Sequence, residues 1–130
     1  MTYHLGKRSL ARLEGVHPDL VKIVKQAIVT SKVDFTVIEG LRPLSRQKML
    51  LRTGASRTLR SRHLTGHAVD LAPWVGGAIR WDWPLFYPIA RAMKSAAKDC
   101  GIQIRWGGDW RRFKDGPHFQ LRWKDYPAGK

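Results

Sequence analysis

The sequence predicts an α+β fold, in which a small antiparallel sheet packs against about three helices. Residues 18–28 and 84–100 place apolar side chains at the spacing of one helix face. Shorter stretches elsewhere alternate apolar and polar residues, as β-strands with one buried face do. The chain has 130 residues, of which 43% are hydrophobic. We therefore expect residues 1–130 to form a single domain.

The first half of the chain is expected to contain a long helix, a strand and a short helix. Pro18 and Asp19 begin the long helix. The first turn of a helix tolerates the missing N–H of proline, and its positive dipole end favours the negative charge of aspartate. Its core-facing side chains would be Leu20, Ile23, Val24, Ala27 and Ile28. Residues 35–38 are rich in β-forming side chains. Ser45 and Gly54 would cap and end a short helix over residues 46–53.

The second half of the chain is expected to supply most of the sheet. In residues 68–72 the apolar side chains Val69 and Leu71 point to one face, and Asp70 points to the other. Residues 118–123 alternate in the same way, and His118 also falls on the face away from the apolar side chains. Further elements are predicted as a two-glycine hairpin at 75–78, a helix at 84–100 and a strand at 102–106.

His63 and Asp70 provide half of a metal site. Imidazole and carboxylate groups both bind divalent metal ions, and a zinc site needs at least a third protein ligand. The turn signal at Thr65 and Gly66 lets the chain reverse between the two residues, because glycine tolerates the backbone angles of a reversal. His118 is the natural third ligand. The joint spacing favours a metal site over unrelated surface histidines.

His67 gives an alternative ligand pair. His63 and His67 are four residues apart and would share one face of a helix. That helix would have to run through Gly66, which costs about 1 kcal/mol relative to alanine. The glutamate that follows the first histidine of a zinc-binding helix is also absent from this stretch.

Arg42 and Asp115 are candidate catalytic residues. Pro43 forces an extended conformation on Arg42 at the exit of a predicted strand, where a guanidinium group could clamp a carboxylate or a developing oxyanion. The alternative is a surface arginine beside a turn. Asp115 precedes His118 in a Gly-Pro loop and is the best candidate for the general base that activates a water molecule. A role limited to capping that turn is the alternative.

Charge is the strongest signal in the composition. The chain has 24 Lys and Arg residues against 10 Asp and Glu residues, a formal net charge of +14. This excess favours contact with nucleic acid, an anionic membrane surface or an acidic cell-wall polymer, although a generally solvated cationic surface explains it equally well. The single cysteine, Cys100, excludes an internal disulfide and is expected to be a buried thiol.

The sequence shows neither an export signal nor a membrane span. Residues 1–12 are polar and basic and lack the apolar core of a signal peptide. No apolar run is long enough to cross a bilayer. We therefore expect the protein to stay in the cytoplasm unless another factor releases it.

Trp81 and Trp83 flank the start of the long helix at 84–100. Exposed aromatic side chains could form a stacking platform for nucleic acid. Core packing is the commoner role of tryptophan in a domain of this size, and we expect it here.

Three groups of residues resemble the zinc D-Ala-D-Ala carboxypeptidase and L-alanyl-D-glutamate endopeptidase family, of the VanY and phage endolysin type. They are Glu39-Gly40-x-Arg42, Ser61-x-His63-x-x-Gly66-x-Ala68-x-Asp70, and Trp106-Gly107-Gly108-Asp109-Trp110 followed by Asp115-x-x-His118-Phe119-Gln120. Their order, and the elements around them, resemble a stand-alone catalytic domain of the endolysin branch over the whole chain.

The resemblance implies a role for each of these residues. The implied ligands of a Zn²⁺ ion are His63, Asp70 and His118. Asp115 is implied as the general base, Arg42 as the group that stabilises the tetrahedral intermediate, and both Arg42 and Ser61 as substrate-binding residues. Carboxypeptidase members often carry glutamate where this chain has Asp115, so the shorter side chain favours the endopeptidase branch.

The implied activity is hydrolysis of peptidoglycan stem peptides at the L-alanyl-D-glutamate bond during bacterial lysis. The protein would be a monomer that accumulates in the host cytoplasm, acts on the periplasmic cell wall after release, and uses its basic surface to bind anionic envelope polymers. A D-alanyl-D-alanine carboxypeptidase of the same family is the nearest alternative. A nucleic-acid-binding protein and a non-catalytic wall-binding domain are alternatives from other classes, although no nucleic-acid partner is expected because the site is rich in imidazole.

Overall fold

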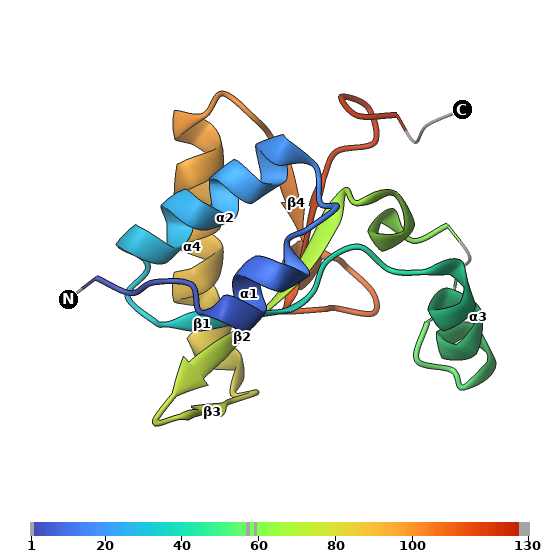
Figure 1. The fold of residues 1–130 in the computed structure, drawn as a ribbon, viewed down its shortest axis with the longest axis horizontal. Helices are drawn as coiled ribbons and strands as arrows, with labels where there is room; N and C mark the ends of the chain where they lie inside the picture. The colour runs from blue at the N-terminus through green and yellow to red at the C-terminus, as the bar shows by residue number, and fades with distance from the viewer. Residues whose placement is uncertain (1, 57, 59, 128–130) are drawn as a thin grey trace.

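An antiparallel sheet forms the centre of the fold in the computed structural model, which describes residues 2–56, 58 and 60–127 (Figure 1). Its strand order is β1-β2-β5-β4, and β3 pairs with the far part of β2. The strands are β1 (Phe35–Glu39), β2 (Ala68–Val75), β3 (Ala78–Ile79), β4 (Ile104–Trp106) and β5 (His118–Leu121). Every described pairing is antiparallel, so the predicted α+β class with a small antiparallel sheet is confirmed.

The helices divide into a packed pair and two smaller pieces. The α-helices are α1 (Lys7–Arg12), α2 (Pro18–Thr30), α3 (Leu44–Arg52) and α4 (Trp83–Asp99), and the 3₁₀ turns are η1 (Arg62–Thr65) and η2 (Gly107–Asp109). Helices α2 and α4 pack against each other on one side of the sheet, whereas α3 lies apart on the opposite side of the molecule (Figure 1). None of the described helices has the length and apolarity needed to cross a membrane.

The core lies between the sheet and helices α2 and α4. The buried side chains of α2 are the five that the periodicity predicts, Leu20, Ile23, Val24, Ala27 and Ile28. They meet the side chains of β2 and β5 that point toward the helices, including Val69, Leu71, Phe119 and Leu121, all fully buried. Because side chains alternate along a strand, Asp70 and His118 point to the other face of the sheet.

Several element boundaries differ from the predictions. Helix α3 begins at Leu44, with Pro43 as its N-cap, because the fixed backbone angle of proline already directs the chain into the helix. Strand β5 ends at Leu121 rather than at Trp123, since residues 123–126 form turns. The sequence also predicts a basic loop over residues 56–62, and positions 57 and 59 of this loop lie outside the described residues.

Helix α1 has no counterpart in the sequence predictions. It contains only six residues and has no side-chain N-cap, so its local sequence signal is weak. Tertiary contacts hold it in place, because the hydroxyl of Ser9 accepts a hydrogen bond from the Val37 backbone N–H at 3.0 Å. The Arg12 guanidinium donates to the Val37 carbonyl at 3.0 Å.

The predicted core role of the tryptophans is wrong for most of them. Among the six tryptophans, all within the described residues, only Trp106 is buried. Trp81 and Trp83 remain 57% and 41% exposed, because they precede or begin α4 at its solvent-facing end. Cys100 is half-buried rather than fully buried, with its thiol 3.7 Å from the Gln26 side-chain oxygen.

Gly66 combines a left-handed backbone with a close approach to another segment. Its φ is +75°, and a Cβ there would collide with the carbonyl oxygen of Gly15. Gly54 has a similar φ of +81°, but no atom of the described residues lies within 4 Å of the position its Cβ would take. An alanine at Gly54 would therefore add backbone strain alone, whereas an alanine at Gly66 would add both backbone strain and a steric collision.

We expect Gly54→Ala to lower the free energy of unfolding by about 1–2 kcal/mol, the cost of a left-handed residue with a Cβ. Gly66→Ala should lower it by several kcal/mol, because the segment before α2 must also move. Urea denaturation followed by circular dichroism measures both. Equal losses in the two variants would contradict the close packing of residues 15 and 66.

Candidate metal centre

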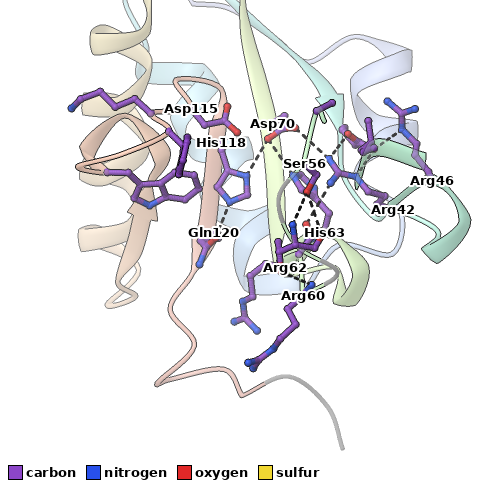
Figure 2. Close-up of a pocket in the computed structure, with 18 of the residues that line it drawn as sticks. Arg42, Arg46, Ser56, Arg60, Arg62, His63, Asp70, Asp115, His118 and Gln120 are labelled. Atoms are coloured by element: carbon purple, nitrogen blue, oxygen red, sulfur yellow. Dashed lines mark hydrogen bonds and ion pairs between the residues drawn. The ribbon is translucent and has the colours of Figure 1, made fainter. Parts of the chain in front are cut away.

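One cleft of about 700 Å³ collects all of the predicted site residues. Its walls come from β1, α3 and the segment after it, η1, β2 and β5, and from the loop of residues 110–115 (Figure 2). The predicted residues that line it are Arg42, Ser61, His63, Asp70, Asp115 and His118. Side chains that are far apart in sequence therefore face one volume.

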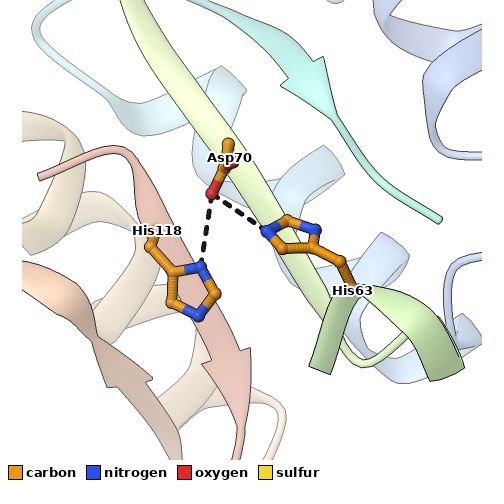
Figure 3. Close-up of side chains that lie close together, drawn as sticks. All are labelled: His63, Asp70 and His118. Atoms are coloured by element: carbon orange, nitrogen blue, oxygen red, sulfur yellow. Dashed lines mark hydrogen bonds and ion pairs between the residues drawn. The ribbon is translucent and has the colours of Figure 1, made fainter. Parts of the chain in front are cut away.

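Three of these side chains, His63, Asp70 and His118, lie close together with their polar atoms facing one another (Figure 3). His63 Nε2 lies 3.2 Å from Asp70 Oδ1, and His118 Nδ1 lies 3.3 Å from the same oxygen. The two imidazole rings are perpendicular to within 20°, with an interplanar angle of 73° and centroids 5.1 Å apart. Both nitrogens thus point at one carboxylate oxygen.

Local structure explains how the three residues converge. Asp70 and His118 are direct partners in the β2–β5 register. His63 reaches them from η1, which the Ser61 side chain caps by accepting a hydrogen bond from the His63 N–H at 3.2 Å. Gly66 then ends η1 in the left-handed conformation and turns the chain into β2. The turn predicted at Thr65 and Gly66 therefore brings His63 beside Asp70.

Each imidazole ring has an inner nitrogen that faces Asp70 and an outer nitrogen that faces away from it. The hydrogen bond of the outer nitrogen fixes the tautomer of the neutral ring. His63 Nδ1 lies 2.8 Å from the Gly40 carbonyl oxygen, so this nitrogen carries the hydrogen and donates it. His118 Nε2 lies 2.8 Å from the side-chain oxygen of Gln120 and donates in the same way. In the neutral rings, His63 Nε2 and His118 Nδ1 then present lone pairs to the Asp70 carboxylate.

This donor set fits a divalent metal ion. The two imidazoles and one carboxylate place their ligand atoms within 4.8 Å of one another. In the neutral rings these atoms all carry lone pairs, which a divalent cation between them would accept. Nitrogen and oxygen ligands at their usual distances from a tetrahedral zinc ion are about 3.4 Å apart. The distances of 3.2 and 3.3 Å to Asp70 match this separation. Hydrogen-bonded outer nitrogens are also typical of metal-ligating histidines.

The electrostatics of the trio agree with a cation site. Burial by itself raises the pKa of the Asp70 carboxyl group, but the hydrogen bonds and positive charge that the His118 and His63 rings supply when they are protonated outweigh it, and they hold that pKa well below its ordinary value. For His118, burial disfavours the charged ring, and the Asp70 carboxylate more than compensates and raises its pKa. Asp70 therefore stays ionised and attracts positive charge to this point.

His67 lies outside the cluster, so the alternative pairing of His63 with His67 is not supported. Among the described residues, the group able to hold a metal consists of His63, Asp70 and His118 alone. His67 Nδ1 lies 2.6 Å from the Thr65 hydroxyl, and its ring lies 5.4 Å from that of His17. Its side chain thus faces α2 rather than the cleft.

Arg42 is a buried member of the site. Its Nη2 and Nε donate to the two carboxylate oxygens of Glu39 at 2.6 and 2.9 Å. The same Nη2 lies 3.9 Å from Asp70 Oδ2. The guanidinium group is therefore held rigidly beside the three candidate metal ligands, and the interpretation of Arg42 as a surface arginine is wrong.

Three supporting residues had no role in the sequence predictions. Fully buried Gln47 accepts from Arg42 Nη1 at 2.6 Å and donates to the Thr58 carbonyl at 2.6 Å, which ties α3 to the site. Gly40 and Gln120 bind the outer nitrogens of the two histidines. Gln120 alternates with the core residues of β5, and this alternation could have placed it on the site face. Gln47 is a single glutamine in a helix with many charged residues, so its sequence context gives no such signal.

Asp115 lies beside the metal cluster with its carboxylate turned toward Asp70 (Figure 2). Its loop is held from both sides, because the Asp115 N–H donates to the Gly107 carbonyl at 3.1 Å and Trp106 Nε1 donates to the Gly116 carbonyl at 2.7 Å. Burial, and then the negative charge of Asp70, raise the pKa of the Asp115 carboxyl group. A raised pKa brings a carboxylate closer to the range in which it can exchange protons.

Comparison with known proteins identifies the family. A profile described as phage L-alanyl-D-glutamate peptidase matches residues 1–122. The chain belongs to this family. It is similar to the L-alanyl-D-glutamate peptidase of Escherichia phage T5, with 33% identity over 99% of this chain and 96% of that protein. It is also similar to the peptidoglycan L-alanyl-D-glutamate endopeptidase CwlK of Bacillus subtilis (strain 168), with 33% identity over 82% of this chain and 75% of CwlK.

A solved structure of an L-Ala D-Glu endopeptidase has the same fold. The L-Ala D-Glu endopeptidase ChiX of Serratia marcescens superposes with a TM-score of 0.91 and 52% sequence identity, over 94% of this chain and 92% of that one. The resemblance deduced from the motifs is thereby confirmed at the level of family and fold.

We expect the purified protein to bind one divalent metal ion per chain, and His63→Ala and Asp70→Asn to lose it, because each removes a ligand from a three-residue site. His67→Ala should keep full metal content and serves as the matched histidine control. Elemental analysis after dialysis measures the stoichiometry. Loss of the ion from His67→Ala but not from His63→Ala would contradict the assigned ligand set.

Proposed function

We propose that this chain is a zinc metallopeptidase that hydrolyses the L-alanyl-D-glutamate bond of peptidoglycan stem peptides. The observation that carries the proposal is the convergence of His63, Asp70 and His118 beside Asp115, in a family whose relatives are named for this bond. Imidazole-rich sites with one carboxylate suit zinc better than magnesium or calcium. The three protein ligands leave further positions open, as catalytic zinc sites do.

The ion would be held by the three ligands of the metal centre. A bound zinc ion supplies Lewis acidity, which polarises a carbonyl group and makes water more acidic. The chain keeps both histidines in the tautomer that this requires, through the Gly40 carbonyl and the Gln120 side chain. Asp70 supplies the negative charge that holds the ion.

Asp115 would act as the general base and then as the general acid. Its carboxylate takes a proton from the attacking water and delivers it to the departing amine of D-glutamate. Both of the causes that raise its pKa, burial and the neighbouring Asp70 charge, favour the protonated form that this second step uses. The loop contacts of Asp115 and Gly116 keep the carboxylate at the edge of the ligand set.

Arg42 and Ser61 would hold the substrate and its developing charge. Glu39 and Gln47 fix the Arg42 guanidinium, so it does not have to reorganise during the reaction. Its Nη2 lies in the cleft lining, 3.9 Å from Asp70 Oδ2, where it could stabilise a tetrahedral oxyanion. The Ser61 hydroxyl lies 3.5 Å from Arg42 Nη1 and extends this polar edge.

The basic surface would bring the enzyme to its polymer. Five further cations line the cleft, namely Arg46, Arg60, Arg62, Arg112 and Lys114. Stem peptides carry free carboxylates, so a cationic cleft complements them. In this proposal a single-domain monomer accumulates in the host cytoplasm and acts on the cell wall after release.

We expect digestion of purified peptidoglycan to leave L-alanine on the glycan and to release peptides with a free D-glutamate amine. Mass spectrometry of the soluble products identifies the bond that is cut. Release of D-alanine alone would instead establish a carboxypeptidase, and an unchanged polymer would exclude both activities.

The matched control for this experiment is Asp115→Asn. It keeps the size of the side chain and removes the base, so hydrolysis should fall by about 10²–10⁴-fold. Its metal content should equal that of the wild type, since Asp115 is not a ligand. Unchanged hydrolysis by Asp115→Asn would contradict the role given to this residue.

We expect lysis of intact cell walls to weaken as the salt concentration rises, while cleavage of a soluble stem peptide changes little. Salt screens the attraction between the net charge of +14 and an anionic polymer, but has less effect on chemistry inside the cleft. Turbidity of cell walls and chromatography of the peptide measure the two rates at several salt concentrations. Equal salt dependence of both rates would refute the role of the basic surface.

A further inference from the structure

A cluster of exposed aromatic side chains lies at the start of α4. We call the side chains of Trp81, Trp83 and Tyr87 the aromatic surface; they are 57%, 41% and 49% exposed. Trp81 and Trp83 pack on the buried Phe86 ring, with centroids 6.4 and 5.9 Å away, and Trp83 lies 6.3 Å from Tyr87. A contiguous patch of exposed apolar side chains often marks an interaction site, whereas single exposed apolar residues are common and need no explanation.

The residues beneath the aromatic surface also contact the loop that carries Asp115. The ring of Phe86 lies 3.1–3.3 Å from the point where a Cβ on Gly116 would be. Tyr87 packs edge-on against Trp106, with centroids 5.7 Å apart, and Trp106 Nε1 binds the Gly116 carbonyl. One layer of side chains therefore separates the aromatic surface from the catalytic loop.

The surroundings of the aromatic surface contain few free charges. Arg80 is paired with Asp82 at 2.8 Å, and Lys94 is paired with Asp109 at 2.7 Å. Among the described residues of this stretch, Arg91 is the cation that has no carboxylate partner. A nucleic acid or an anionic lipid surface needs several free cations in a row. The cleft has several such cations, whereas the aromatic surface does not. We therefore expect the aromatic surface to suit a neutral ligand.

The proposed substrate places such a ligand next to the cleft. In peptidoglycan the stem peptide is joined to the glycan strand through its L-alanine, so one residue and a short lactyl arm separate the scissile bond from the sugar. At about 3.5 Å per residue, this arm spans only about 7 Å. The strand must therefore cross the protein surface close to the metal centre.

We infer that the aromatic surface binds the glycan strand of peptidoglycan. A pyranose ring presents an apolar C–H face that stacks on an aromatic ring, and hydroxyl and acetamido groups that bind N–H donors. The described structure gives the indole N–H groups of Trp81 and Trp83 no protein acceptor, so they are available to these groups. The inference rests on the proposed function, because that function brings the glycan close to the metal centre and its neighbouring loops.

The inference can be tested by a binding measurement that does not depend on catalysis. The ligand is a preparation of glycan strands from which an amidase has removed the stem peptides. We expect the double variant Trp81→Ala/Trp83→Ala to bind these strands about tenfold more weakly than the wild type, from the loss of two stacking contacts. Its cleavage of intact cell walls should fall by a similar factor, while its cleavage of a soluble sugar-free stem peptide should not change. Tryptophan fluorescence, or calorimetry for the double variant, measures binding.

Val29→Ala is the control, because Val29 is an equally exposed apolar residue on α2, away from the aromatic surface. Unaltered glycan binding by the double variant overturns the inference, as does an equal loss on walls and on the soluble peptide. Tryptophan-dependent binding to anionic vesicles in place of glycan also overturns it. If the wild type cleaves no stem peptide but still binds glycan through these tryptophans, the proposed function fails and the inference stands.

Discussion

A single carboxylate oxygen, Asp70 Oδ1, faces two imidazole nitrogens at 3.2 and 3.3 Å, and the remaining site is built around this contact. The Gly40 carbonyl and the Gln120 side chain occupy the outer nitrogens of the two rings. The inner nitrogens then have only lone pairs to offer a carboxylate that is itself negative. In the neutral rings, these lone pairs and the carboxylate suit a cation bound between them. The pairing of β2 with β5 therefore brings together side chains that could hold a metal ion.

Strand β2 divides the molecule into a core and a reaction face. Val69 and Leu71 are buried against α2 and α4, whereas Asp70 between them points into the cleft. On one side of Asp70, Glu39 and Gln47 hold the Arg42 guanidinium; on the other, Gly107 and Trp106 hold the loop of Asp115. Both groups are anchored before substrate arrives, which limits the reorganisation that the reaction requires.

Two surfaces of different chemistry border this centre. The cleft is lined by six arginine and lysine side chains and suits the carboxylates of a stem peptide. The aromatic surface beside the Asp115 loop has mostly paired charges and suits neutral sugar rings. The net charge of +14 alone does not distinguish these regions, because charge pairing depends on which residues become neighbours. A peptide-linked glycan is one polymer that carries both kinds of group.

The sequence by itself determined the fold class, the buried face of α2 and the alternation that turns Asp70 and His118 away from the core, because periodicity of apolar residues is a local property. The motif spacing also indicated the ligands and the family. Only the tertiary structure decided that His67 faces α2, that Gln47 and Glu39 hold Arg42, that α1 forms at all, and that Trp81 and Trp83 stay exposed. Each of these depends on contacts between segments far apart in the chain, and such contacts leave no periodic trace in the order of the residues.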